Sequence, residues 1–225
     1  MSTPAVGIFG LTGCAGDQLV ILNCEDQLLD IVAAVDLRDF ATASSAGDTA
    51  CNLDVALVEG AVVSPLDASR LARIRERSRI LVAVGTCAVW GGVAAPSGAK
   101  ALRESVKVDL NVTGCPIEKD QILAALASLL HGDPPLALEY PVCAECKMRE
   151  NNCLLIGKGE VCCGPLTAAG CDARCPGLGV ACVGCRGPAS DANYPSALAM
   201  FSAAPVSRDD VARKLATFAP EGVRP

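Results

Sequence analysis

Cysteine is the residue with which this sequence could do chemistry. The 225-residue chain contains 14 cysteines but only one histidine, His131. The sequence shows no export signal, so we expect a reducing compartment, where cysteines more often bind metals or act in catalysis than form disulfides. A single histidine nearly excludes mixed Cys/His zinc sites. All-cysteine sites remain, and these hold either iron-sulfur clusters or zinc.

Three cysteines in the first half of the chain share one kind of position. Each follows a strand-like apolar segment and has a glycine one or two residues before it: Cys14, Cys87 and Cys115. Sites in open α/β sheets lie beyond the carboxyl ends of the strands, so the topology could bring these cysteines together. Glycine suits a backbone that must turn sharply and approach a bulky cluster. Each cysteine alone could be an ordinary buried residue, but their shared position favours a common site.

A second group of cysteines lies in residues 141–188, a segment with nine cysteines and no helical or strand periodicity of useful length. Such a segment cannot build its own apolar core, so we expect metal clusters to hold it together. Eight of its cysteines would ligate two four-iron clusters: Cys143, Cys146, Cys153, Cys162, Cys171, Cys175, Cys182 and Cys185. One or two all-cysteine zinc ribbons are the alternative. Cys175 is followed by proline, as in bacterial ferredoxin motifs, and this favours iron.

The elements that must position the first group alternate between strands and helices up to about residue 140. We expect strands at residues 5–9, 31–37, 54–62, 79–85 and 106–112. Their apolar runs are continuous, as in strands buried on both faces of a parallel sheet. The clearest helices are expected over residues 65–77, after Ser64 as N-cap, and over 117–130, before Gly132. The predicted fold class is therefore α/β with an open, mostly parallel sheet.

The sequence predicts three parts. Residues 1–140 form the α/β domain, 141–188 the two-cluster segment, and 189–225 a helical tail in which Ser207 caps a helix. The net charge of -6, without a cluster of Lys or Arg, makes nucleic acid an unexpected partner. The apolar stretches are far shorter than the roughly 20 residues of a membrane span, so no membrane insertion is expected. We place the protein in the cytoplasm.

Five motifs match a known family in spacing and order. They are Cys14-Ala15-Gly16, VEGAV at 58–62, VGTCAVWGG at 84–92, TGCPIEK at 113–119, and the segment from PVCAEC to CRGP. Together they resemble the small subunit of group 3 nickel-iron hydrogenases, and most of all the delta subunit of NAD(P)-linked sulfhydrogenases. The resemblance covers about residues 5–188.

The resemblance implies a flavodoxin-like domain followed by a ferredoxin-like, loop-rich segment. It also implies three 4Fe-4S clusters. A proximal cluster in the α/β domain would face the nickel-iron site of a large subunit, and the other two would pass electrons towards flavin- and NAD(P)-binding iron-sulfur subunits. This chain lacks the paired CxxC motifs of a nickel site. It would therefore be a non-catalytic subunit of a hydrogen:NAD(P)+ oxidoreductase.

One position departs from the family pattern. The first motif is usually CxxC, whereas here Asp17 stands in place of the second cysteine. We expect Asp17 to ligate the proximal cluster with Cys14, Cys87 and Cys115, because its side chain starts from the same backbone position and ionises readily. The alternatives are an iron capped by water, a cluster that has lost one iron, and an Asp17 that only begins a helix. An oxygen ligand would change the potential and spin state of the cluster.

Three cysteines are left without a metal: Cys24, Cys51 and Cys163. If a helix begins near Asp17, Cys24 lies two turns along it, about 10 Å away, which is too far for the same cluster. Cys162 and Cys163 are adjacent and either could ligate. We prefer Cys162, because the family reads C-L-G-P at this place. The other eleven cysteines and Asp17 then give four ligands to each of three clusters.

Two charged residues stand close to these motifs. Glu59 lies at a strand end, where it could belong to a proton route or bond backbone amides near the cluster, and we favour the structural role. Arg186 could complement the charge of a nearby cluster or of a subunit surface. Neither residue is expected to be catalytic.

Two other functions fit parts of the sequence. The cluster subunit of respiratory NADH:quinone oxidoreductase shares the α/β half, but it typically carries adjacent cysteines there, and the only adjacent pair here is Cys162-Cys163. A free-standing ferredoxin-like carrier would shuttle electrons without a fixed partner. It would need no large α/β platform that presents a cluster at one end.

Overall fold

The computed structural model describes residues 3–24, 27, 33, 35–40, 51–133, 138, 140–202, 207–216 and 218. The chain divides into two compact units, residues 1–135 and 136–225. Residues 189–225 thus fall in the same unit as the cysteine-rich segment. No helix among the described residues is long and apolar enough to cross a membrane.

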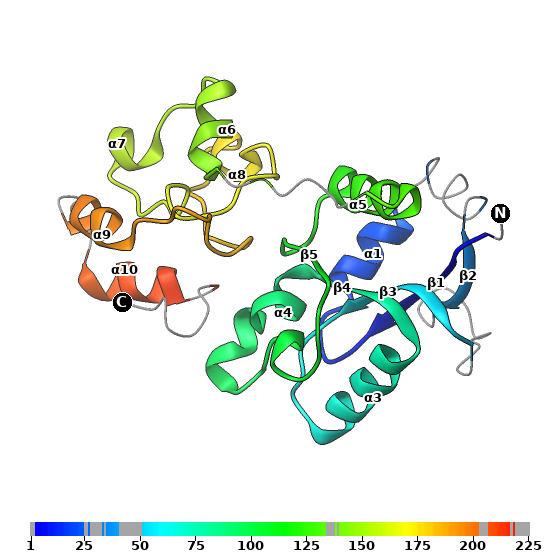
Figure 1. The fold of residues 1–225 in the computed structure, drawn as a ribbon. Coiled ribbons are helices and arrows are strands. Elements are labelled where there is room, and N and C mark those ends of the chain that lie inside the picture. Colours follow the sequence, from blue (N-terminus) through cyan, green and yellow to red (C-terminus); the bar gives the residue numbers. More distant parts are fainter. Residues whose placement is uncertain are drawn as a thin grey trace. The chain divides into compact units, whose positions relative to one another are not determined.

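The first unit is built on a five-stranded parallel sheet (Figure 1). Its strands are β1 (Ala5–Gly10), β2 (Asp36–Phe40), β3 (Leu53–Glu59), β4 (Ser78–Val84) and β5 (Leu110–Val112). The order β2-β1-β3-β4-β5, with every neighbouring pair parallel, is that of the flavodoxin-like fold. The central strands β3 and β4 are buried along most of their length, as their continuous apolar runs predict. The predicted α/β fold class is confirmed.

Helices cover both faces of this sheet. On one face, residues of α1 (Gly16–Leu22) and α5 (Lys119–His131) pack against β1, β3 and β4. On the other face, α3 (Pro65–Glu76), α4 (Gly85–Trp90) and the 3-10 helix η2 (Leu102–Glu104) bury apolar side chains against the same strands. A second 3-10 helix, η1 (Gly92–Ser97), follows α4. The sheet is therefore the middle of three layers, and its strand ends stay free to carry a site.

The strong helix signals of the sequence hold in the structure. Ser64 caps α3 and forms a capping box with Asp67: the Asp67 N–H donates to Ser64 Oγ at 3.2 Å, and the Ser64 N–H donates to Asp67 Oδ2 at 3.0 Å. Gly132 ends α5 in the left-handed conformation that glycine favours.

Two strand predictions need correction. The strand expected at 31–37 instead runs from Asp36 to Phe40, and Ala33 is helical; Ile31, Val32 and Ala34 lie outside the described residues. The strand expected at 106–112 covers only Leu110–Val112. Val106 and Val108 gave this stretch its strand-like apolar pattern. In the structure they pack against the core under α3 and α4 and lie outside the paired strand.

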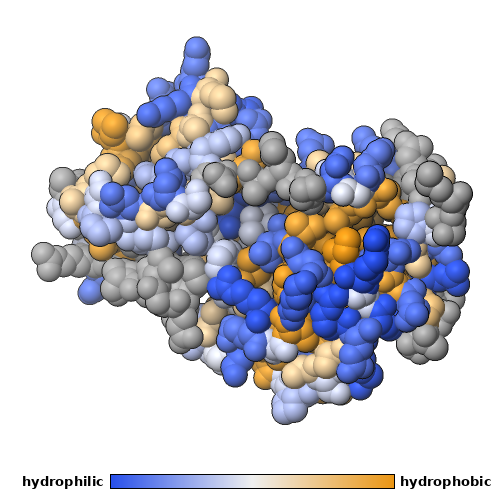
Figure 2. Space-filling view, in the orientation of Figure 1, coloured by the Kyte–Doolittle hydropathy of each residue, from blue (hydrophilic) through white to orange (hydrophobic). Residues whose placement is uncertain are grey.

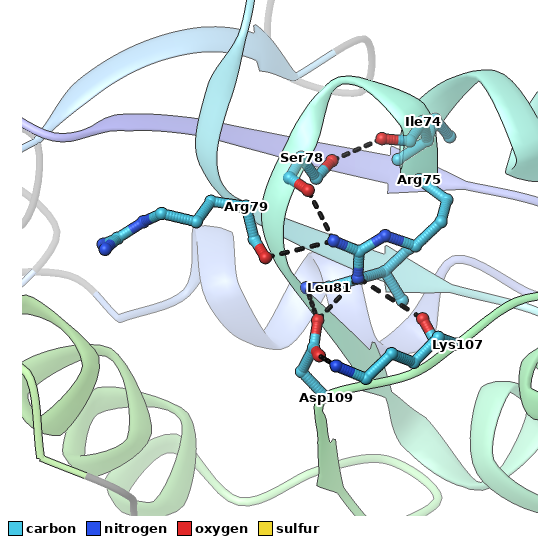
Figure 3. A network of polar contacts seen from close by, with 7 residues as sticks. All are labelled: Ile74, Arg75, Ser78, Arg79, Leu81, Lys107 and Asp109. Carbon is cyan, nitrogen blue, oxygen red and sulfur yellow. Dashed lines mark hydrogen bonds and ion pairs between the residues drawn. The ribbon is translucent and has the colours of Figure 1, made fainter.

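Arg75 of α3 ties that helix to the strands beside it (Figure 3). Its Nη1 pairs with Asp109 Oδ2 at 2.5 Å, and its Nη2 donates to the backbone oxygens of Ser78 and Arg79 at 2.5 and 3.0 Å. Lys107 Nζ also pairs with Asp109, at 2.9 Å from Oδ1. The network fixes the approach of the chain to β5, which precedes Cys115.

The second unit consists of short helices joined by loops. They are α6 (Val142–Met148), α7 (Leu154–Lys158), α8 (Arg174–Gly177), α9 (Tyr194–Ser202) and α10 (Arg208–Ala216). The first three lie in the segment for which the sequence predicts no helix. They span seven, five and four residues, too few for a helical period to appear in the sequence.

An apolar core joins the cysteine-rich segment to α9 and α10. Phe201 of α9 is fully buried, and it packs in one cluster with Val161, Leu166 and Val211. The segment therefore lacks a core of its own but shares one with the tail. The Asp210 N–H donates to Ser207 Oγ at 3.1 Å, so the predicted cap of α10 is confirmed.

Candidate metal centres

Residues with thiol or acidic side chains lie at, or a few residues after, the ends of four neighbouring strands. β1 leads into the loop of Cys14, β3 ends at Glu59, β4 runs directly into α4 with Cys87, and β5 leads to Cys115. Because parallel strands end at the same edge of a sheet, these residues gather there. We call Cys14, Asp17, Glu59, Cys87 and Cys115 the strand-end site.

Asp17 connects the loops that carry the other ligand candidates. Its Oδ1 accepts a hydrogen bond from the Ile117 N–H at 2.8 Å, two residues after Cys115. Its carboxylate also lies against Gly85, two residues before Cys87: a Cβ on Gly85 would be 1.8 Å from Oδ2. The side chain is only 6% exposed. The carboxylate thus lies inside the strand-end site and not on the outer face of α1.

Glu59 holds the first turn of α1. The N–H groups of Asp17 and Gln18 donate to its two carboxylate oxygens at 3.4 and 3.1 Å. The N-cap residue Ala15 has no side chain that could do this, and its φ is 60°. Glu59 of β3 therefore accepts hydrogen bonds from amides in the first turn of α1, because the helix has no capping side chain of its own. These contacts support the structural role expected of Glu59.

Three groups of the strand-end site, Asp17, Cys87 and Cys115, have a raised pKa. Burial raises the pKa of Asp17 to about 6; the Ile117 N–H opposes this, and the charge of Glu59 adds to it. Burial, followed by the charges of Cys87, Asp17 and Cys14, raises the pKa of Cys115 to about 11. The pKa of Cys87 is raised by burial and then by Cys14, Asp17 and Glu59. The charges of neighbouring groups of the site contribute to each of these shifts, and a cationic iron centre would oppose them.

Glycines leave room beside the sulfur atoms of this site. A Cβ on Gly92 would lie 2.6 Å from Cys87 Sγ, and one on Gly16 would lie 3.2 Å from Cys14 Sγ. Cys14 and Cys115 are exposed, whereas Cys87 is half-buried. The donor set and the space around it fit a bulky cluster close to the surface of the unit.

Eight of the nine cysteines of the second unit can be divided into two candidate ligand groups. In the first, burial raises the pKa of Cys143 to about 11, and the charges of Cys162, Cys146 and Cys153 add to this. A Cβ on Gly164 would lie 3.3 Å from Cys143 Sγ and 3.6 Å from Cys162 Sγ, so the two sulfurs flank one glycine. These four cysteines form one candidate ligand set.

The second group contains Cys171, Cys175, Cys182 and Cys185. Burial raises the pKa of Cys171, Glu145 and Cys185 raise it further, and Arg186 lowers it. Cys182 is buried beside the first group: its N–H donates to Cys162 Sγ at 3.3 Å. Burial raises the pKa of Cys182 as well. We group Cys182 with Cys185 as ligand candidates because the two form a Cys-x2-Cys motif.

Of the three cysteines expected to bind no metal, Cys24 and Cys51 lie away from the ligand groups, and the Cys163 N–H donates to the Cys182 backbone oxygen at 2.9 Å. Cys24 is 1% exposed, and its thiol donates to the Val20 backbone oxygen at 3.4 Å. Cys51 packs partly buried against the core under α3. Cys163 is 3% exposed in the core of the second unit, whereas Cys162 faces Cys143. This placement supports Cys162 over Cys163 as a ligand.

Among the residues that the structure describes, no three His, Cys, Asp or Glu side chains converge to hold a single metal ion. The two ligand groups and the strand-end site are therefore defined by loop positions, close contacts and shared electrostatics.

One residue that no sequence pattern singled out lies close to these ligand candidates. Glu145, between two cysteines of α6, is buried and contacts the loop of Cys171.

Comparison with known proteins decides the family. Residues 14–129 match the family described as NADH ubiquinone oxidoreductase, 20 Kd subunit. The chain is 37% identical over 235 residues to sulfhydrogenase 2 subunit delta of Pyrococcus furiosus, covering 95% of this chain and 98% of that protein. The chain belongs to the hydrogenase small-subunit family that includes this delta subunit.

Other members of the hydrogenase small-subunit family are more distant. The delta subunit of the NAD-reducing hydrogenase HoxS of Cupriavidus necator is 31% identical over 168 residues, which cover 57% of this chain and 79% of that protein. A solved actinobacterial-type NiFe-hydrogenase from Ralstonia eutropha has a chain that matches with a TM-score of 0.68 at 20% identity, covering 96% of this chain and 90% of that one. The structural match shows the shared fold, and the predicted family resemblance is confirmed.

Proposed function

We propose that this chain is the electron-transfer small subunit of a cytoplasmic, NAD(P)-linked nickel-iron hydrogenase. The complex would oxidise H2 to two protons and two electrons, or run the reverse, coupled to a nicotinamide. This chain would relay the electrons between a nickel-iron large subunit and the flavin- and NAD(P)-binding subunits. The observation that carries the proposal is the gathering of cysteine-bearing loops at adjacent strand ends, in a chain that matches a sulfhydrogenase delta subunit over nearly its full length.

Three 4Fe-4S clusters would supply the one-electron chemistry of this relay. The strand-end site would hold the proximal cluster through Cys14, Asp17, Cys87 and Cys115. The contacts of Asp17 with Gly85 and Ile117 support its inclusion, because they hold the carboxylate between the loops of two other ligands. The two cysteine groups of the second unit would each hold one further cluster.

The residues of this chain would control where electrons enter and leave. Cys14 and Cys115 are exposed, so the proximal cluster would lie where a large subunit can approach it. Cys153, the N-cap of α7, is also exposed, and Ile156 in the same helix is 86% exposed. Figure 2 shows apolar surface over α7. We expect another subunit to contact this exposed apolar side chain beside a cluster ligand.

Anaerobic purification through a tag on this chain tests the proposal. We expect a nickel-containing subunit and a flavin-containing subunit to co-purify, and the complex to reduce NAD or NADP with H2. The isolated chain should show no hydrogenase activity. Recovery of a monomer with all its clusters intact, and without any partner, would instead indicate a free-standing electron carrier.

A further inference from the structure

Glu145 lies in sequence between two ligands of one candidate cluster, but its side chain serves the other. It belongs to α6, which also carries Cys143 and Cys146. The side chain is 6% exposed and points to a loop 25 residues further along the chain. Its Oε1 accepts the Gly170 N–H at 2.6 Å, and its Oε2 accepts the Ala173 N–H at 3.1 Å. Two backbone donors on two oxygens suit an ionised carboxylate.

The loop that Glu145 holds has an uncommon backbone. Gly170, Asp172 and Ala173 have φ values of 112°, 54° and 46°. Side chains other than glycine rarely adopt this left-handed region, so the loop needs contacts from outside to keep its shape. The same loop carries Cys171 and leads into α8 with Cys175. Loss of the Glu145 hydrogen bonds would therefore disturb two neighbouring ligands.

The carboxylate also lies beside a ligand sulfur. The Cys171 thiol donates towards Glu145 Oε2 at 3.9 Å. A thiolate bound to iron has no proton to donate, so with a cluster in place a negative oxygen would face a negative sulfur. Because Glu145 is buried, water screens this charge only weakly. A nearby negative charge makes it harder to add an electron to a cluster, which lowers its reduction potential.

Arg186 places the opposite charge near the same cysteine. It is 4% exposed, and its Nε donates to the backbone oxygens of Ala168 and Ala169 at 3.2 and 2.8 Å. These oxygens belong to the residues just before the loop that Glu145 holds. Arg186 also follows Cys185 directly in the sequence, so its buried positive charge lies next to a second ligand of the same group.

We propose that Glu145 is a positioning residue for the cluster of Cys171, Cys175, Cys182 and Cys185, that its charge keeps the reduction potential of this cluster low, and that Arg186 opposes it. The inference rests on the proposed iron-sulfur function. The cluster takes up one electron from one neighbour and gives up one electron to the next. No bond of Glu145 or Arg186 forms or breaks.

The test is a redox titration followed by EPR on the native complex with Glu145→Gln. Glutamine has nearly the same shape but no charge, so the midpoint potential of one cluster should rise while the other two stay unchanged. Arg186→Gln should lower the midpoint potential of the same cluster. The matched control is Glu150→Gln, since Glu150 follows α6 but is exposed. Water screens its charge, so no potential should move.

Three unchanged potentials in a fully iron-loaded Glu145→Gln complex would overturn the inference and leave the proposed function intact. If the variant instead loses the iron of one cluster, the positioning role is supported, and Arg186→Gln decides the role of charge. A lowered midpoint potential in the Arg186→Gln complex supports the role of charge, and an unchanged potential contradicts it. A wild-type complex without iron in this chain would refute the proposed function itself.

Discussion

Asp17 enters the strand-end site with one carboxylate oxygen already occupied. The Ile117 N–H donates to Oδ1, which leaves Oδ2, the oxygen next to Gly85, to approach a metal. The site would therefore offer three sulfur ligands and one oxygen. Oxygen is a harder ligand than sulfur, so the iron that it binds should differ electronically from the other three.

An Asp17→Cys substitution tests this ligand. We expect the iron content to stay the same, while the EPR signal of one cluster changes in potential and spin state, because a thiolate replaces the oxygen at one iron. The signals of the other two clusters should not change. Cys51→Ser is the control, since Cys51 lies away from the site and its loss should alter no signal. A spectrum indifferent to residue 17 would show that Asp17 is not a ligand.

Gly85 is the second residue on which the strand-end site depends. Its φ is 83°, and a Cβ there would lie 1.8 Å from Asp17 Oδ2. A Gly85→Ala variant should therefore displace the carboxylate and lose the proximal cluster, about four of roughly twelve irons. Metal analysis of the purified complex measures this.

Gly132→Ala is a matched control for that experiment. Gly132 has a φ of 82°, but nothing lies within 4 Å of an added Cβ. The substitution should destabilise the chain by about 1 kcal/mol through backbone strain alone, with the iron content unchanged. Equal loss of iron in both variants would mean that strain, and not the contact with Asp17, accounts for the effect.

At the scale of the elements, Asp109 joins α3, β4 and the approach to β5. Burial alone would raise its pKa, but hydrogen bonds from the Leu81 N–H, Lys107 and Arg75 outweigh burial and lower the pKa to about 2. The folded-state pKa thus lies below the ordinary value of about 3.9. Asp109 therefore stabilises the fold above about pH 4, and this contribution disappears as the pH falls towards 2.

An Asp109→Asn substitution should destabilise the first unit by about 1 to 2 kcal/mol at pH 7, because the charge that Arg75 and Lys107 face is lost. The difference from the wild type should shrink as the pH falls from 4 to 2. Urea unfolding followed by the fluorescence of Trp90, the single tryptophan, measures this in the first unit. Asp36→Asn is the control, since its pair with Arg38 is exposed and should contribute little. A difference independent of pH would contradict the linkage.

How far the sequence predicts these elements depends on the length of each signal. β3, β4, α3 and α5 are long and periodic or continuously apolar, and the sequence locates them to within a few residues. α8 has only four residues and leaves no pattern, and β5 has only three, so its predicted strand began four residues too early. Glu145 was passed over for the same reason. Its helix was not predicted, so the inward direction of its side chain had no basis in the sequence.

The candidate site was predictable in part because strand ends can be read from the sequence. The positions of Cys14, Cys87 and Cys115 after three strands place them at one edge once the sheet is parallel. The contacts that hold Asp17 were not predictable, since they depend on the left-handed backbone of Gly85 and on the amide of Ile117, far away in the chain.

At the scale of the whole molecule, two compact units divide the proposed work. The first would present one cluster at the edge of a parallel sheet, where the fold places sites. The second would hold two clusters in a segment whose apolar core is completed by α9 and α10. A chain of this kind moves electrons and leaves the reaction with hydrogen to another subunit.

The most direct test of this account is the metal content of the native complex, purified without oxygen, together with EPR during stepwise reduction. We predict about twelve irons for each copy of this chain and three cluster signals that appear at different potentials. Zinc in place of iron would contradict the account, because a zinc-bound chain could not carry electrons.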